Sequence, residues 1–277
     1  MGKKRRGGRK GAWALTRRLN PTAAAALLEV LRRVTPGGKD ASEIPSSSGV
    51  RVSVVTKTPP PARGGWTRRP LPASAVKSKP VAKPATVGRR WLLVPTSLRT
   101  LPRTDRLILR IEPGAAFGSG EHETTRLCLR LIEATAPGRS FLDVGTGSGI
   151  LAIAALLRGF RWAIGMDPDA AALRAARINA RFNGCSERLR LRRASLESWT
   201  PPGRFDAIAA NLLAGLLSAQ AGRLASWLAP GGALVVSGVL RSQEKEVADS
   251  MHGAKLIPTA RLTEGKWLAL AFAARVR

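Results

Sequence analysis

The sequence contains no tyrosine and only 5% aromatic residues, so chemistry that needs a phenol as acid, base or nucleophile is excluded. Its two cysteines, Cys128 and Cys185, have neither the CxxC spacing of a zinc site nor the pairing pattern of a disulfide framework. Acidic residues are also scarce, with 18 Asp and Glu against 46 Lys and Arg. The cysteine usage predicts a reducing, cytoplasmic setting without a structural metal.

Long apolar runs are missing as well. No window approaches the ~20 apolar residues of a membrane-spanning helix. The most apolar early stretch, Thr22–Leu28, is followed by Glu29 and has no signal-peptide cleavage site. We therefore expect a soluble, unexported protein with no membrane contact. A chain of 277 residues can hold one large α/β domain with an extension.

The positive charge is unevenly distributed. The formal net charge is +28, and residues 1–90 carry 21 of the basic residues but only three of the acidic ones. Residues 1–11, MGKKRRGGRKG, cannot bury apolar surface and should form a disordered basic arm. Such an arm attracts polyanions such as RNA. A merely solvated tail is an equally good interpretation of this segment.

The N-terminal third has the composition of an extension. Leucines after Asn20 and Pro21 follow helical spacing and predict one short amphipathic helix that ends near Val34. Residues 35–86 are rich in Pro, Ser, Gly and Lys, which is typical of a flexible linker. We therefore divide the chain into a basic, largely disordered extension, residues 1–86, and a folded domain, residues 87–277.

The folded domain alternates short apolar runs with helical patterns beyond Ser140: FLDVG, ILAIAALLRGF, WAIGMD, AALRAARINARFN, LRLRRA, FDAIAAN and ALVVSGV. This alternation is typical of a doubly wound α/β fold, in which helices cover both faces of a mostly parallel sheet. The last two apolar runs, KLIPTARL and KWLALAFAARV, are separated only by residues 263–265. They predict a closing antiparallel hairpin.

The strongest local signal is the segment DVGTGSG, residues 143–149, between an apolar strand and a helix. Gly145 and Gly147 allow a tight turn and close approach of a ligand to the backbone. Asp167 ends the second strand, where a carboxylate can accept both hydroxyls of a ribose. Together with the absence of a GxxxxGK[ST] loop, this pattern favours an adenosyl ligand with a small charged end over a nucleoside triphosphate.

Two further segments carry a family resemblance. Residues 113–125, PGAAFGSGEHETT, resemble the PGxAFGTGxHxTT signature of the bacterial ribosomal protein L11 methyltransferase family, and residues 211–215, NLLAG, resemble its NILAG motif. The resemblance runs from about Val87 to the C-terminus. It implies a seven-stranded class I methyltransferase (Rossmann-like) fold and transfer of methyl groups from S-adenosylmethionine to protein amino groups, chiefly of lysine.

The resemblance also implies site residues. Thr125, Gly145, Asp167 and Asn211 match the family's cofactor-binding positions, and Gly147 joins them through the glycine turn. Asn211 is the candidate catalytic residue, because it ends the fourth strand, where an amine would meet the methyl group. Its side-chain oxygen and the carbonyl of Leu212 could orient the amine. An in-line methyl transfer of this kind needs no metal.

Several alternatives stay open. His122 could act as a general base or could order the glycine-rich loop, and Asn211 could simply be a strand-end turn residue. The family's N-terminal recognition domain has its own α/β core, a pattern that residues 1–86 lack, and Leu216 replaces the proline that follows NILAG. We expect a monomer that methylates ribosomal protein L11, with the basic arm contacting ribosomal RNA. The rival functions are an RNA methyltransferase and a non-catalytic RNA-binding or ribosome-assembly protein.

Overall fold

The chain divides into two compact units, Met1–Pro80 and Val81–Arg277. The computed structural model describes the backbone of four strands in the first unit, and residues 83–112, 120 and 122–276 of the second. The predicted basic arm and the predicted helix after Asn20 lie outside the described residues. The division falls a few residues before the expected boundary at residue 86, because Ala85–Val87 already pairs with a strand of the second unit.

The first unit contains a four-stranded antiparallel sheet in the order β2-β3-β1-β4. Three of these strands fall within residues 35–86, where the composition predicts a flexible linker, and the structure differs from the prediction there. The reason lies in GVRVSVVT, residues 49–56, whose valines alternate with polar residues as in a strand that is buried on one face. The strands are β1 (Trp13–Leu19), β2 (Ala41–Ser46), β3 (Gly49–Thr56) and β4 (Thr67–Pro70).

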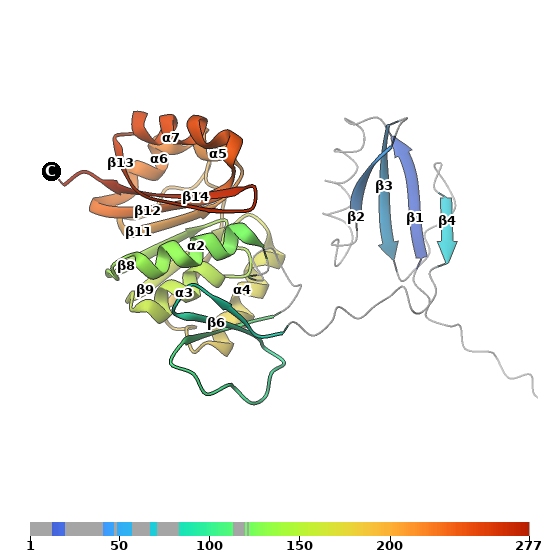
Figure 1. The fold of residues 1–277 in the computed structure, drawn as a ribbon, viewed down its shortest axis with the longest axis horizontal. Helices are drawn as coiled ribbons and strands as arrows, with labels where there is room; N and C mark the ends of the chain where they lie inside the picture. The colour runs from blue at the N-terminus through green and yellow to red at the C-terminus, as the bar shows by residue number, and fades with distance from the viewer. Residues whose placement is uncertain are drawn as a thin grey trace, which may run out of the picture. The chain divides into compact units, whose positions relative to one another are not determined.

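The second unit is built around a seven-stranded sheet, shown in Figure 1. Its order is β10-β9-β8-β11-β12-β14-β13. The first five of these strands are parallel, and β14 runs antiparallel to both β12 and β13, which confirms the predicted doubly wound sheet with a closing hairpin. The strands are β8 (Ser140–Val144), β9 (Trp162–Asp167), β10 (Leu189–Arg193), β11 (Phe205–Asn211), β12 (Leu228–Leu240), β13 (Leu256–Glu264) and β14 (Trp267–Ala274).

Helices cover both faces of this sheet (Figure 1). Alternate strand residues enter two separate cores: in β11, Ala207 and Ala209 pack in the core that α2 and α3 complete, and Ile208 and Ala210 in the core of α5, α6 and α7. Burial on both faces explains why the central strands β8 and β11 are mostly apolar, whereas the edge strands β10 and β13 carry more polar residues. The helices are α2 (Glu123–Ala134), α3 (Ile150–Arg158), α4 (Ala170–Phe182), α5 (Ala214–Ala219), α6 (Ala221–Ser226) and α7 (Glu244–Gly253), the last preceded by the 3-10 turn η2 (Arg241–Gln243).

A small three-stranded sheet precedes α2. It consists of β5 (Ala85–Val87), β6 (Trp91–Pro95) and β7 (Leu107–Ile111), in that order. Trp91 is fully buried, and its Nε1 donates a hydrogen bond of 3.0 Å to the carbonyl of Leu129 in α2. The strand β7 packs on α3 and α4. This sheet therefore brings the chain to the edge of the large sheet at which the glycine-rich loop lies.

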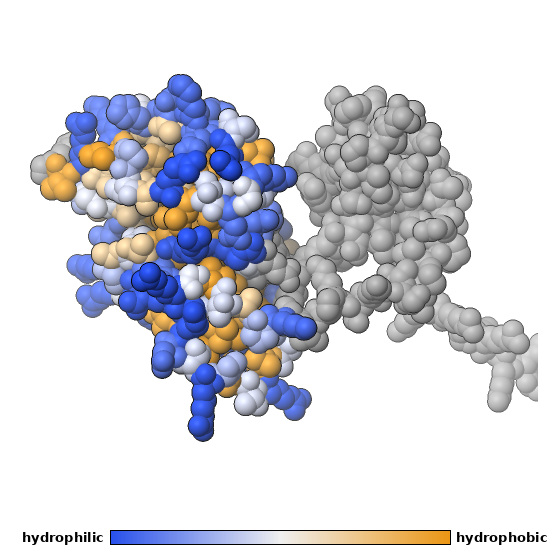
Figure 2. Space-filling view, in the orientation of Figure 1, coloured by the Kyte–Doolittle hydropathy of each residue, from blue (hydrophilic) through white to orange (hydrophobic). Residues whose placement is uncertain are grey.

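The face of the second unit that Figure 2 shows carries mostly polar side chains. Figure 2 shows hydrophilic side chains over α7, with smaller apolar patches between the charged groups elsewhere on this face. Among the residues that the structure describes, no helix is both long and apolar enough to cross a membrane.

Candidate functional site

The glycine-rich loop joins the carboxyl end of β8 to the start of α3. Gly145, Gly147 and Gly149 have positive φ angles of 73°, 53° and 80°, which side-chain-bearing residues rarely adopt. A Cβ atom on Gly145 would lie 2.7 Å from Cδ2 of Leu212. Gly145 therefore needs glycine for both its conformation and its space.

The side chain of Asp143, at the end of β8, fixes the conformation of the loop by hydrogen bonds. Its Oδ2 accepts hydrogen bonds from Oγ1 of Thr146 at 2.7 Å and from the backbone N of Ala152 at 3.1 Å. The residue is 1% exposed, and this burial raises the pKa of its carboxyl group to about 7. Its Oδ1 is buried and accepts no hydrogen bond from a described residue. Asp143 is therefore a buried residue that holds the glycine-rich loop through hydrogen bonds to Thr146 and Ala152.

Asp167 lies at the carboxyl end of β9, next to the loop. Its Oδ2 accepts a 3.0 Å hydrogen bond from the backbone N of Gly147, and its Oδ1 accepts one of 2.9 Å from Asp169. Burial is the main cause that raises the pKa of Asp167. Because a carboxylate has about four lone-pair positions, these two bonds leave capacity for two hydroxyl donors. The geometry brings together two predicted residues, Gly147 and Asp167.

Asn211, at the end of β11, contacts the N-terminus of α2. Its Nδ2 donates a hydrogen bond of 3.2 Å to Oγ1 of Thr124. The same Oγ1 lies 2.8 Å from Nδ1 of His122, and this nitrogen also caps α2 by accepting from the backbone N of Thr124 at 3.3 Å. The ring of His122 packs edge-on against Trp267 at 5.0 Å. These contacts favour the ordering role of His122 over the general-base role.

Thr125 occupies the first turn of α2 and is 1% exposed. Its Oγ1 is buried and has no hydrogen-bond partner among the described residues. Buried hydroxyl groups normally have a partner, so an unpaired one needs an explanation. A ligand group that forms a hydrogen bond with this hydroxyl would explain why it has no protein partner.

The signature segment that precedes α2 is only partly described. Residues 113–119 and Glu121 lie outside the described residues, while Gly120 has a φ of 86° and would place a Cβ against the side chain of Leu93. The start of this segment is anchored by α4. Asn179, which is fully buried, donates to the carbonyl of Ser148 at 2.8 Å and accepts from the backbone N of Glu112 at 2.9 Å. One side chain thus ties the signature segment to the glycine-rich loop.

Three residues of this site were missed by the sequence reasoning: Thr124, Asn179 and Gly238. Gly238 has a φ of 84°, and a Cβ atom there would lie 2.2 Å from the carbonyl oxygen of Leu212. The available signals were weak, namely a second threonine in ETT, an asparagine in a helical run, and the glycine in VVSGV. Each acts through a contact with a residue distant in the sequence.

No group of three or more His, Cys, Asp or Glu side chains among the described residues could hold a metal ion. Cys128 and Cys185 are free and buried, and burial raises the pKa of both thiols. The described chemistry at this edge of the sheet is therefore that of backbone amides, two aspartates, hydroxyl groups and the side-chain amides of Asn179 and Asn211.

Comparison with known proteins agrees with this geometry. The model of the ribosomal protein L11 methyltransferase (PrmA) family matches residues 75–275. A relative of that name from Pelotomaculum thermopropionicum is 38% identical over 215 residues, which cover 73% of this chain and 70% of the relative. Another, from Pelobacter propionicus, is 40% identical over 196 residues, which cover 69% of this chain and 63% of the relative. The chain thus spans slightly less than two thirds of the latter protein.

A solved structure supports the same assignment. The crystal structure of a ribosomal protein L11 methylase from Lactobacillus delbrueckii subsp. bulgaricus matches with a TM-score of 0.65 and 31% identity, over 70% of this chain and 100% of the solved one. The second unit accordingly has the class I methyltransferase fold, and the chain belongs to the ribosomal protein L11 methyltransferase family.

Proposed function

We propose that this chain is an S-adenosylmethionine-dependent N-methyltransferase that modifies amino groups, chiefly of lysine, on ribosomal protein L11. One observation carries the proposal: Gly145, Asp167 and Asn211 lie at the carboxyl ends of the neighbouring strands β8, β9 and β11. The strand order reverses between β8 and β11, and ligands of open α/β sheets bind at such a point. The family membership supplies the reaction class.

The cofactor would lie along this edge. S-adenosylmethionine supplies a methyl group bonded to a positively charged sulfur. The backbone of Gly145 and Gly147 and the unpaired hydroxyl of Thr125 would hold its methionine end, and the remaining lone pairs of Asp167 would accept the ribose hydroxyls. The buried, unpaired Oγ1 of Thr125 is the feature of the described residues that most directly fits a missing polar partner.

The acceptor amine would meet Asn211. Because Nδ2 of Asn211 is bonded to Thr124, the other end of the amide, Oδ1, faces away from Thr124 and can accept a hydrogen bond from the amine. A lysine amine, with an ordinary pKa of about 10.4, must be held in its neutral form to attack. Asn211, with the carbonyl of Leu212, would aim the nitrogen lone pair at the methyl carbon. The N–C bond forms as the S–C bond breaks, and the amine proton passes to water.

A second proposal concerns partners. The excess of basic residues in the first 90 positions supports contact between this region and ribosomal RNA, as a polyanion that a positive segment attracts. An enzyme with a ribosomal protein as substrate would work in the cytoplasm, and one copy of the chain holds all the site residues named above, which is compatible with a monomer. The same charge supports the rival function, an RNA methyltransferase.

Transfer of radiolabelled methyl groups tests these proposals. Purified, unmethylated ribosomal protein L11 and ribosomal RNA are offered as separate acceptors to the full chain and to the Asp167→Ala variant. We expect label on the protein, strongly reduced in the variant. Label on the RNA alone would establish the rival enzyme. Cofactor binding without transfer to either acceptor would instead support a non-catalytic RNA-binding or ribosome-assembly protein.

A further inference from the structure

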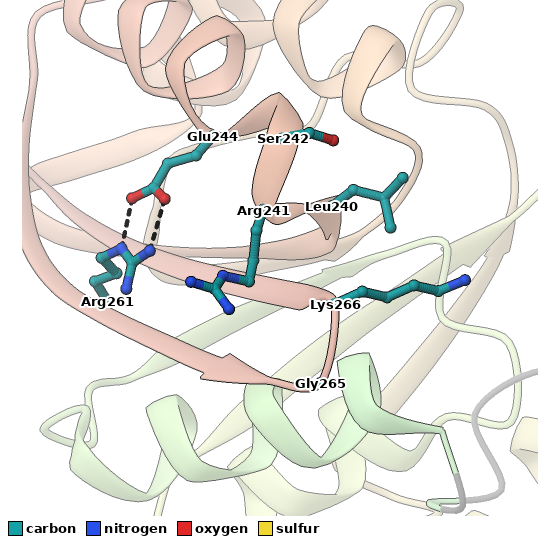
Figure 3. A pocket seen from close by; sticks show the side chains of 7 residues that line it. All are labelled: Leu240, Arg241, Ser242, Glu244, Arg261, Gly265 and Lys266. Carbon is teal, nitrogen blue, oxygen red and sulfur yellow. Dashed lines mark hydrogen bonds and ion pairs between the residues drawn. The ribbon is translucent and has the colours of Figure 1, made fainter.

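An open surface pocket lies beyond the carboxyl end of β12. It is a cavity of about 840 Å³, formed where η2 and the start of α7 face the turn between β13 and β14. Figure 3 shows Glu244 and Arg261 pointing toward each other, with Arg241 beside them, while the side chain of Lys266 extends along the other side of the pocket. The lining residues are Leu240, Arg241, Ser242, Glu244, Arg261, Gly265 and Lys266. We call this cavity the hairpin pocket.

Positive charge dominates the hairpin pocket. Arg261 forms a salt bridge with Glu244: its Nε donates to Oε1 at 2.5 Å and its Nη2 donates to Oε2 at 2.7 Å. This hydrogen-bonded pair, together with the nearby charge of Arg241, lowers the pKa of Glu244. Within the described part of the chain, neither Arg241 nor Lys266 forms an ion pair. Two cations thus remain to attract an anionic group.

The hairpin pocket is connected to the acceptor position by a series of contacts. The backbone N of Arg241 donates to the carbonyl of Lys266 at 3.0 Å, and Nζ of Lys266 lies 5.5 Å from the ring centre of Trp267. Trp267 in turn packs on His122, whose hydrogen bond to Thr124 leads to Asn211. Both sites therefore lie at the carboxyl edge of the same sheet, where one bound polypeptide could contact both.

We propose that the hairpin pocket binds an acidic side chain of the protein substrate, close in sequence to the amine that is methylated. This inference rests on the proposed function and adds a recognition element to it. A guanidinium group and an ammonium group match one or two carboxylates in charge and in hydrogen-bond donors. A nucleic acid strand fits less well, since Glu244 is fixed in the pocket and would repel a continuous run of phosphates.

Paired peptide acceptors test the proposal. Each pair carries the same lysine, with glutamate at nearby positions in one peptide and glutamine in the other. For the full-length wild-type chain we expect the KM of the glutamate peptide to be about five- to tenfold lower, as two partly exposed charge pairs would give, with similar kcat. Added salt should reduce the difference. Equal KM values for the two peptides at low salt would overturn the proposal.

A charge-reversal variant of Arg241 and Lys266 provides the second test. The Arg241→Glu/Lys266→Glu variant should lose the preference for glutamate and should prefer a peptide with arginine at the same positions, with the glutamine peptide turned over as before. The control is Arg190→Glu, an exposed residue of β10 at the opposite edge of the sheet. It should keep the wild-type preference. An equal loss of preference in the control would show a general charge effect and would contradict a local site.

Binding separates this inference from the proposed function. Fluorescence anisotropy of the same labelled peptides, with the cofactor product present, measures the pocket even if no acceptor is methylated. Absence of methyl transfer with a retained glutamate preference in binding would overturn the proposed function alone. Displacement of the glutamate peptide by an RNA oligonucleotide more strongly than by excess unlabelled peptide, with RNA binding lost in the double variant, would assign the pocket to RNA and overturn the inference.

Discussion

The side-chain amide of Asn211 donates a hydrogen bond to the hydroxyl of Thr124, across 87 positions of the sequence. The hydroxyl has its own partner in Nδ1 of His122, at 2.8 Å. A hydroxyl group carries one hydrogen, so a Thr124 that donates to His122 can only accept from Asn211. This arrangement fixes which end of the Asn211 amide faces the proposed acceptor site.

Thr124→Val should therefore impair catalysis without impairing cofactor binding. Valine has nearly the same shape but cannot accept the hydrogen bond, so the amide of Asn211 loses its fixed orientation. We expect kcat to fall about tenfold, the equivalent of about 1.4 kcal/mol for one hydrogen bond. Steady-state methyl transfer and cofactor titration measure the two effects. Thr124→Ser, which keeps the hydroxyl, should stay close to wild type, and equal losses in both variants would refute the orienting role.

Asp143 should make the stability of the protein depend on pH. Its pKa is about 7 in the fold, raised by burial from an ordinary value of 3.8. Between these two values the folded state holds a proton that the unfolded chain has lost. The free energy of unfolding therefore decreases as pH rises from about 4 to about 7, by an amount of roughly 4 kcal/mol at most.

The Asp143→Asn variant isolates this effect. Asparagine can still accept the hydrogen bonds from Thr146 and Ala152, but it does not titrate. Urea unfolding of both proteins across this pH range should show a smaller decrease with rising pH for the variant. The partly buried carboxyl of Asp167 is present in both proteins, so its contribution largely cancels in the difference. Parallel pH profiles would mean that Asp143 is not protonated in the fold.

Asn179 should affect cofactor binding from a distance. Asn179→Leu would leave the carbonyl of Ser148 and the backbone N of Glu112 without this buried partner, at a cost of about 1–3 kcal/mol for each group. Asn183→Leu is the matched comparison, since among the described residues the side chain of Asn183 binds the backbone of Arg110 and of its own helix, away from the glycine-rich loop. Both variants should be less stable in urea. Only Asn179→Leu should also weaken cofactor binding measured by calorimetry, and equal weakening would deny the link to the glycine-rich loop.

The contrast between Asp167 and Asn179 shows what the sequence could predict. The position of Asp167 follows from local information, because a strand that ends beside a glycine turn places its last residue at the sheet edge. The role of Asn179 depends on Glu112, the residue that follows β7, 67 positions earlier, whose backbone N donates to the Asn179 side chain. The helical spacing in ARINARFN predicts a helix, but it does not predict which backbone groups of other segments will form hydrogen bonds with the side chains of that helix.

The N-terminal unit shows a different limit. Proline, serine and lysine dominate the average composition of residues 35–86, whereas the strand signal of β3 occupies only eight residues. Window averages therefore favoured a linker, although the local alternation of valines favoured a strand. The apolar runs of β8 and β9 could be interpreted reliably because each of these strands is followed by a helix pattern of the expected length.

Gly238→Ala should displace the carbonyl group that, with Asn211, is proposed to orient the amine. The added Cβ atom would lie 2.2 Å from the oxygen of Leu212, and the positive φ of 84° adds backbone strain. We expect a loss of stability of about 1–3 kcal/mol and a fall in kcat that exceeds any change in cofactor affinity. Urea unfolding and steady-state methyl transfer are the measurements.

Gly215→Ala is the control for this substitution. Gly215 lies in α5, four positions after Asn211 in the same motif, and a Cβ atom there meets nothing within 4 Å. Alanine in a helix should leave activity unchanged and should raise stability by about 0.5–1 kcal/mol. If both variants lose kcat to the same degree, the NLLAG segment is sensitive to any change and no special role falls to the Leu212 carbonyl. A loss confined to Gly238→Ala, with cofactor affinity retained, would place that carbonyl at the acceptor amine.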